Sequence, residues 1–283
     1  MTYREFIADK TRDCAVVAHR GIWRNAPENS LSAIQRAIDA RYDVVEIDIR
    51  RSVDGGLFLL HDDTLERMTG LDQRPETLAS GDLAVLRLRD RDGGEGNAFT
   101  LERLPHLAEV FELTRGRIFL HLDVKQRDAI PDVIALAKAM GVEQQVDFWA
   151  SLKSGEDLRW IRETVLPHDV LFMAKTRLNV PDAAVQLALL GQLMPGVCEV
   201  YFDDLQQLSA LNDIRRRNGM ALWVNTLDSV ACAGFTDTAA LADPDAVWGR
   251  LIDAGISVIQ TDEAAALKSY LAARRARILS KEE

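Results

Sequence analysis

Short apolar runs rich in β-branched residues alternate with amphipathic segments along almost the whole chain. The apolar runs have the length of buried strands, and the segments between them repeat apolar residues at helical spacing, as Leu31, Ile34 and Ile38 do. A final helix is expected at about residues 263–278. The parallel strands predicted in this way lie near residues 14–18, 43–49, 117–124, 145–150, 170–174, 197–202, 220–225 and 256–260.

This alternation predicts an α/β protein with a parallel sheet whose faces are covered by helices. Eight strands in about 250 residues fit a closed (β/α)8 TIM barrel. An open doubly wound sheet is the alternative, but no glycine-rich phosphate-binding fingerprint follows the first strand. We therefore predict a single TIM-barrel domain over residues 1–283.

One further strand, Leu57–Leu60, does not fit the parallel set. It follows the second strand after a short link, whereas a parallel return needs about a dozen residues, so we expect an antiparallel hairpin. The pair Asp54-Gly55 is typical of a two-residue hairpin turn. With that turn, the register places His61 opposite Asp48.

Residues at about 62–103 follow this hairpin and differ from the rest of the chain. They are charged, they include the glycine-rich run 93–96, and they show no clear barrel strand. We expect them to form a small insertion, or cap, at one end of the barrel.

Composition narrows the class of protein. Apolar residues make up 47% of the chain and charged residues 28%, which is ordinary for a soluble protein. Residues 1–12 lack the apolar core of a signal peptide, and no run approaches the roughly 18 apolar residues of a membrane helix. The three cysteines are widely spaced, so neither a disulfide framework nor a zinc site is indicated. We predict a reduced, cytoplasmic protein with no integral membrane association.

The net charge of −10 bears on possible partners. It repels polyanions and argues against nucleic acid. A small anionic substrate remains possible if local positive charge or a metal ion receives it. The oligomeric state stays open.

Acidic residues within predicted strands are the first candidates for chemistry. Glu46 and Asp48 are two residues apart on the second strand, so both side chains point to the same face. Burying two carboxylates inside a barrel is costly, and a divalent cation would relieve that cost. Asp123 on the third strand can complete a set of oxygen ligands, which favours Mg2+ or Ca2+ over zinc. The alternative is that these carboxylates are only salt-bridged within the barrel.

Histidine and arginine residues at the ends of apolar runs are further candidates for chemistry. His19-Arg20-Gly21 closes the first strand, at the face where barrel enzymes keep their active sites. Arginine offers a fixed fork of donors for phosphate oxygens. Paired with His61, His19 becomes a candidate for acid–base catalysis. His121 also points inward but is expected to lie deeper, in the core.

Five blocks of the sequence carry a resemblance to a known family, and they read AHRGIWRNAPENSLSAIQRAI, VVEIDIRRSVDGGLFLLHDDTLERMTG, LHLDVK, LWVNT and GISVIQTD. In order and spacing they resemble the glycerophosphodiester phosphodiesterase family. The resemblance covers nearly the whole chain, and the first two blocks are highly specific. It implies a (β/α)8 barrel that hydrolyses glycerophosphodiesters to sn-glycerol 3-phosphate and an alcohol, with a divalent metal ion, commonly Ca2+ or Mg2+.

The resemblance also implies roles for individual residues. His19 and His61 correspond to the general acid and base, and Glu46 and Asp48 to metal ligands. The remaining correspondences are Arg20 and Lys125 as phosphate-binding residues, and Trp223 and Asn225 in a late-strand motif that lines the pocket. For Trp223 a packing role is an equal alternative.

The sequence departs from the family at Asp123, where glutamate is usual. Aspartate is one methylene shorter, which puts the identity and affinity of the metal in question. Two other functions stay open: a related barrel lyase or synthase acting on another phosphodiester, such as a sugar phosphodiester, and a barrel that has lost catalysis and only binds. The alcohol group of the substrate is not determined by the sequence.

Overall fold

The computed structural model describes residues 1–280 and confirms the predicted alternation of strands and helices. Each predicted parallel strand is present within about three residues of its expected bounds, and the last helix begins and ends within one residue of its expected bounds. The chain folds into two compact units. Of the described residues, the first unit comprises 19–149 and 164–171, and the second comprises 1–18, 150–163 and 172–280.

The first unit contains a sheet in the order β7-β6-β2-β3. Strands β2, β6 and β7 are parallel, whereas β3 pairs antiparallel with β2. Ser30 caps the first helix of this unit by accepting a hydrogen bond from the Ala33 amide at 3.1 Å. The elements are β2 (Val44–Arg51), β3 (Leu57–Leu59), β6 (Phe119–Val124), β7 (Val146–Trp149), α2 (Leu31–Asp39), α5 (Leu107–Thr114) and α6 (Ile130–Ala139).

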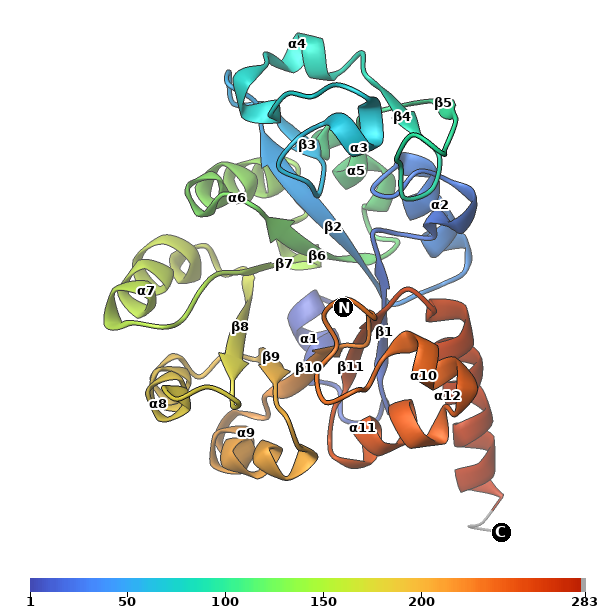
Figure 1. Cartoon of the computed structure of the whole chain (residues 1–283). Coiled ribbons are helices and arrows are strands. Elements are labelled where there is room, and N and C mark those ends of the chain that lie inside the picture. The colour runs from blue at the N-terminus through green and yellow to red at the C-terminus, as the bar shows by residue number, and fades with distance from the viewer. Residues whose placement is uncertain (281–283) are drawn as a thin grey trace. The chain divides into compact units, whose positions relative to one another are not determined.

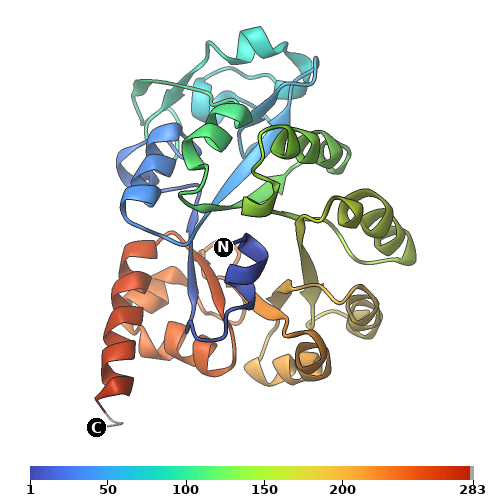
Figure 2. The same ribbon diagram turned by 180° about the vertical axis from the view of Figure 1, so that it is seen from behind.

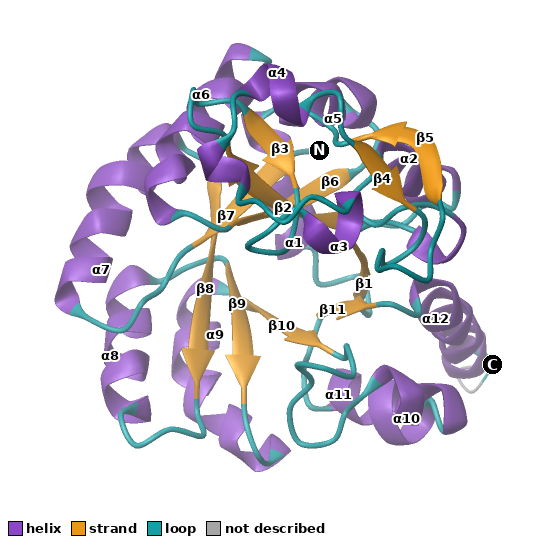
Figure 3. Ribbon diagram, turned by 45° about the horizontal axis from the view of Figure 1, so that its top comes forward, coloured by secondary structure: helices purple, strands orange, loops and turns teal. Residues whose placement is uncertain are grey.

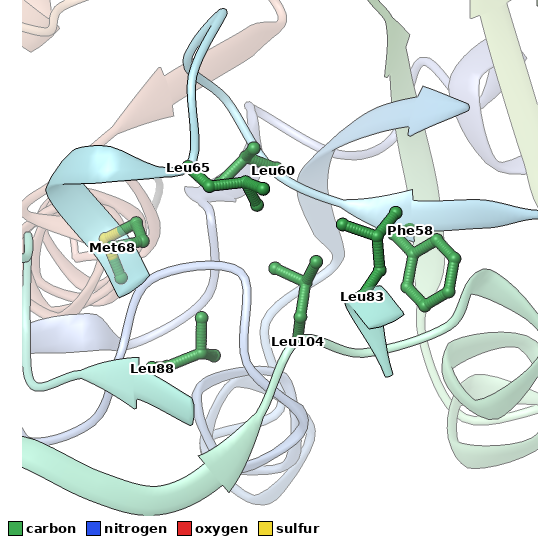
Figure 4. Close-up of a cluster of buried hydrophobic side chains, with 7 residues drawn as sticks. All are labelled: Phe58, Leu60, Leu65, Met68, Leu83, Leu88 and Leu104. Carbon is green, nitrogen blue, oxygen red and sulfur yellow. The ribbon is translucent and has the colours of Figure 1, made fainter. Parts of the chain in front are cut away.

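The segment that follows β3 folds into short elements of its own. These are α3 (Glu66–Thr69), α4 (Ser80–Leu83), β4 (Arg87–Arg89) and β5 (Phe99–Arg103), and Figure 1 shows them gathered beside β3. Strands β4 and β5 form a separate two-stranded antiparallel sheet. A buried apolar cluster ties these elements to the hairpin (Figure 4); its members are Phe58, Leu60, Leu65, Met68, Leu83, Leu88 and Leu104.

The predicted register of the β2–β3 hairpin is wrong by one residue. The pairs are Ile49 with Leu59 and Arg51 with Leu57, and the Leu60 amide donates to the Asp48 carbonyl at 3.1 Å. Leu60, not His61, therefore lies opposite Asp48. The reason is a three-residue loop, 53–55, because the Ser52 amide already bonds to the Gly56 carbonyl at 2.8 Å.

The second unit contains parallel strands in the order β8-β9-β10-β11-β1. Figure 3 shows β8 and β9 running side by side in the same direction. Helix α12, red in Figure 2, is held to the segment before it by a hydrogen bond of 2.7 Å from the Tyr270 hydroxyl to Asp245. The elements are α1 (Tyr3–Ala8), β1 (Ala15–His19), α7 (Gly155–Trp160), β8 (Leu171–Arg177), α8 (Ala183–Leu193), β9 (Val197–Tyr201), α9 (Asn212–Asn218), β10 (Ala221–Asn225), α10 (Asp237–Ala242), α11 (Arg250–Asp253), β11 (Val258–Thr261) and α12 (Ala264–Leu279).

The eight parallel strands and their helices are those of a (β/α)8 barrel, which confirms the predicted fold class. The strands are almost wholly buried, as expected for a parallel sheet with both faces covered. Within residues 1–280, no helix combines the length and the apolar character needed to cross a membrane.

Candidate active site

The first candidate residues lie where β1 ends and the chain turns towards α2. His19 is the last residue of β1, and Arg20 and Gly21 have positive φ angles of 54° and 84°. A Cβ atom at Gly21 would lie 2.7 Å from the backbone carbonyl carbon of Ala33. Only glycine fits both this left-handed backbone and this close approach to α2. Gly21 therefore sets the path of the backbone that carries His19 and Arg20.

Three carboxylates meet in the first unit. Glu46 and Asp48 lie on β2, and Asp48 pairs in register with Asp123 on the neighbouring strand β6. One carboxylate oxygen from each residue lies within 4.8 Å of the others. Glu46 and Asp48 are buried, and Asp123 is half-buried. The structure thus brings together the three acidic residues that the sequence singled out.

Two cationic side chains contact this carboxylate cluster. The Lys125 ammonium lies 2.6 Å from Asp48 Oδ1 and 2.7 Å from Asp123 Oδ2. Arg20 Nε lies 3.0 Å from Asp48 Oδ2. Burial alone would raise the pKa of Asp48, but the charges of Lys125 and Arg20 hold it well below its usual range. Asp48 is therefore a carboxylate at neutral pH, and it is already engaged by cations.

Among the three carboxyl groups, Glu46 is the one whose negative charge is least offset by neighbouring side chains. Burial and the neighbouring Asp48 raise the pKa of Glu46 well above its usual value. Its Oε2 accepts a hydrogen bond of 3.2 Å from the Arg20 amide and lies 3.9 Å from His19 Nε2. A divalent cation would offset the cost of ionising Glu46, and an all-oxygen set of this kind suits Mg2+ or Ca2+. The residues therefore fit the metal that the family resemblance implies.

Two residues that the sequence did not mark for this site hold its carboxylates in place. The Asn29 side chain donates to Asp48 Oδ2 at 2.8 Å and accepts from the Asp48 amide at 3.1 Å. The Trp149 indole donates to Asp123 Oδ1 at 2.8 Å. In the sequence Asn29 is typical only of a helix start, and no local signal relates it to Asp48, which lies 19 residues later.

His61 lies just beyond β3 in the same unit. Its Nδ1 is 2.7 Å from Asp62 Oδ1, and 40% of its side chain is exposed. The buried Arg50 guanidinium donates to the His61 carbonyl at 3.0 Å through Nη2. An imidazole whose Nδ1 is held by a carboxylate keeps its Nε2 available for proton transfer.

His121, which the sequence placed in the core, is buried. Its Nδ1 lies 2.8 Å from Asp147 Oδ1, and Asp147 is itself fully buried. This pair belongs to the interior of the first unit.

Part of the chain is similar in sequence to known proteins. A segment of 113 residues is 35% identical to a glycerophosphodiester phosphodiesterase of Caldanaerobacter subterraneus, covering 39% of this chain and 44% of the relative. A segment of 124 residues is 37% identical to glycerophosphodiester phosphodiesterase 1 of Mus musculus, covering 41% of this chain and 35% of that protein. Over these segments the chain is similar to glycerophosphodiester phosphodiesterases. The matched segments span less than half the length of these curated relatives.

Solved structures agree with the fold. A glycerophosphodiester phosphodiesterase from Agrobacterium tumefaciens superposes with a TM-score of 0.67 at 22% identity, covering 89% of this chain and 98% of that one. A phosphodiesterase from Oleispira antarctica, solved in complex with the product sn-glycerol-3-phosphate, superposes with a TM-score of 0.65 at 20% identity, covering 90% of this chain and 95% of that one. A family described as a domain of unknown function matches residues 172–271.

The late-strand motif that resembles the glycerophosphodiester phosphodiesterases lies on β10, in the second unit. Trp223 is fully buried, and its indole donates to Asn225 Oδ1 at 2.8 Å. Asn225 in turn donates to the buried Glu199, which is paired with Lys175 at 2.9 Å. The pocket-lining role of Trp223 and Asn225 stays a prediction. Glu199 and Lys175 were not marked by the sequence analysis.

Proposed function

We propose that this chain is a metal-dependent phosphodiesterase that hydrolyses a glycerophosphodiester to sn-glycerol 3-phosphate and an alcohol. The observation that carries the proposal is the convergence of the Glu46, Asp48 and Asp123 carboxylates within 4.8 Å in a relative of the glycerophosphodiester phosphodiesterases. The product bound in the Oleispira antarctica phosphodiesterase supports the class of substrate.

Glu46, Asp48 and Asp123 are the proposed ligands of Mg2+ or Ca2+. When bound, the cation would neutralise negative charge on the phosphodiester. A cation shared by these carboxylates would neutralise the negative charge of Asp48. The side chains of Arg20 and Lys125, which neutralise it in the metal-free protein, would then become available to phosphate oxygens. Arginine provides a planar fork of donors for such oxygens, and lysine a compact positive charge.

His19 and His61 are the proposed acid–base pair. One imidazole accepts the proton of the attacking hydroxyl, while the other donates a proton to the leaving alkoxide, so a phosphorus–oxygen bond forms as another breaks. The attacking hydroxyl belongs either to water or to the glycerol 2-position of the substrate. In the second route the cyclic phosphate is opened by water, with the two histidines exchanging roles.

Product analysis by 31P NMR tests the proposal. The metal-stripped protein is incubated with glycerophosphocholine or glycerophosphoethanolamine, and Mg2+, Ca2+ or Mn2+ is then added. We expect sn-glycerol 3-phosphate to appear only with metal. A cyclic phosphate as the final product would identify a lyase, and metal binding without turnover of either diester would overturn the proposed activity on them.

A further inference from the structure

Arg67, in the 62–103 segment, contacts Asp62, and Asp62 in turn contacts the proposed catalytic residue His61. Asp62 Oδ1 lies 2.7 Å from His61 Nδ1, and Arg67 on α3 holds the same carboxylate through Nε at 2.5 Å and Nη2 at 2.9 Å. Burial would raise the pKa of Asp62, but hydrogen bonds with His61 and Arg67 hold it well below its usual range. Asp62 is therefore an anion that orients the His61 ring.

Arg67 also contacts the carboxylate that binds Arg20. Its Nη2 donates to Glu28 Oε1 at 2.6 Å. Glu28 is only 4% exposed, and both of its oxygens accept hydrogen bonds of 3.1 Å from Arg20 Nη1. Glu28 thus lies between two guanidinium groups, and one of these belongs to the proposed phosphate-binding arginine.

The backbone of Arg67 is fixed by the glycine-rich run of the same segment. The Gly94 amide donates to the Arg67 carbonyl at 2.7 Å. A Cβ at Gly93, whose φ is 73°, would lie 2.5 Å from that carbonyl oxygen. The neighbouring Met68 is anchored in the apolar cluster of Figure 4. The backbone of Arg67 is consequently held by packing and hydrogen bonds, which fixes the position from which its side chain extends.

We propose that Arg67 is a positioning residue that holds Asp62 against His61 and Glu28 against Arg20, so that the acid–base group and the phosphate-binding group are set relative to each other. The inference rests on the proposed function. It assigns a catalytic purpose to the segment after the β2–β3 hairpin, since that segment supplies both Arg67 and the glycines that fix it.

The test combines kinetics with a spectroscopic measurement on His61. Arg67→Gln should lower kcat by about tenfold to a hundredfold, the range typical of groups that orient functional side chains through a hydrogen bond. KM should rise as well, because Glu28 would lose one of the two guanidinium groups that fix it beside the phosphate-binding Arg20. Arg67→Lys keeps one charge but cannot form the same fork, so we expect an intermediate kcat. Arg89→Gln is the matched control, because Arg89 in the same segment donates to the Asn97 carbonyl and stacks on Phe99.

A double-mutant cycle separates positioning from general damage to the fold. Arg67 acts on His61 only through Asp62, so the loss of kcat in Asp62→Asn combined with Arg67→Gln should be smaller than the product of the two single losses, and any further loss beyond Asp62→Asn alone should arise through Glu28. Independent losses that multiply would overturn the proposal. If Arg67→Gln does not fold, the same cycle is run with Arg67→Lys.

Imidazole 15N NMR of His61 gives a reading that does not need turnover. We expect Nδ1 to carry the proton in the native protein and the tautomers to mix in Arg67→Gln. Unchanged imidazole signals together with unchanged kcat would overturn the inference. If the native protein cleaves no glycerophosphodiester but the His61 signals still depend on Arg67, the proposed function fails while the structural coupling holds.

Discussion

The Lys125 ammonium lies 2.6 Å from Asp48 Oδ1, within the cluster of three carboxylates. Part of the negative charge of the proposed metal-binding carboxylates is thus neutralised by Lys125, which is itself proposed to bind phosphate. Burial would lower the pKa of Lys125, but Asp48 and Asp123 raise it, so the group is a cation at any ordinary pH. Lysine and metal ion should therefore compete for the same carboxylates.

Lys125→Met tests this competition. The variant should bind the metal ion more tightly because a competing cation is gone. Its KM should rise about tenfold or more, since a hydrogen bond to a charged group contributes about 1.5–3 kcal/mol. Isothermal titration with Ca2+ and steady-state kinetics measure the two effects. Lys138→Met, which removes an ammonium 3.1 Å from His168, is the control. Weaker metal binding in Lys125→Met would contradict the prediction.

Glu46→Gln should stabilise the metal-free protein at neutral pH. A carboxyl group with a raised folded-state pKa contributes stability below its unfolded pKa and loses it as pH rises through the folded value. The ionised Glu46 is therefore unfavourable in the metal-free fold. Thermal unfolding should give a higher Tm for the variant without metal, and a Tm increase on adding Ca2+ only in the native protein. Glu112→Gln, at an exposed glutamate on α5, should match the native protein in both respects.

Gly21→Ala should be strongly destabilising. A left-handed backbone costs a non-glycine residue about 1–2 kcal/mol, and the added Cβ would overlap the Ala33 backbone at 2.7 Å. Gly55→Ala is the matched control, because Gly55 has a φ of 89° but no atom within 4 Å of the added Cβ. Urea unfolding should show a clearly larger loss for Gly21→Ala. Equal losses of stability in the two variants would mean that the close approach of the Ala33 backbone does not restrict the residue at position 21.

Acid should weaken the attachment of the hairpin loop to α4. Hydrogen bonds from Ser52 and Ser80 lower the pKa of Asp54 to about 2. A carboxyl group with a lowered pKa contributes stability above its unfolded pKa, near 4, and loses it as pH falls through the folded value. The difference in urea midpoint between the native protein and Asp54→Asn should therefore be present at pH 7 and shrink between pH 4 and pH 2. A difference that does not change with pH would contradict this.

The strands could be predicted because parallel strands buried on both faces are largely continuous apolar runs, as in β1, which is apolar from Ala15 to Ala18. The register of the β2–β3 hairpin could not be predicted, because the pair Asp54-Gly55 indicates a turn but does not determine the number of residues in it. The Ser52 hydroxyl bonds to the Gly56 amide at 2.7 Å and to Asp54 at 2.6 Å, and these contacts favour a three-residue loop.

The acidic cluster was predictable for a similar reason. The period of two in a strand places Glu46 and Asp48 on one face, and parallel pairing aligns Asp123 with Asp48. The roles of Glu28 and Arg67 were not predictable, because their 2.6 Å contact joins residues 39 positions apart with no periodic relation.

The most direct test of the central claim is the release of sn-glycerol 3-phosphate from glycerophosphocholine as Mg2+ or Ca2+ is titrated into metal-stripped native protein and Glu46→Gln. The account predicts saturable, metal-dependent release by the native protein and little or none by the variant. Equal release in the presence of a chelator, or no release by the native protein despite measured metal binding, would contradict it.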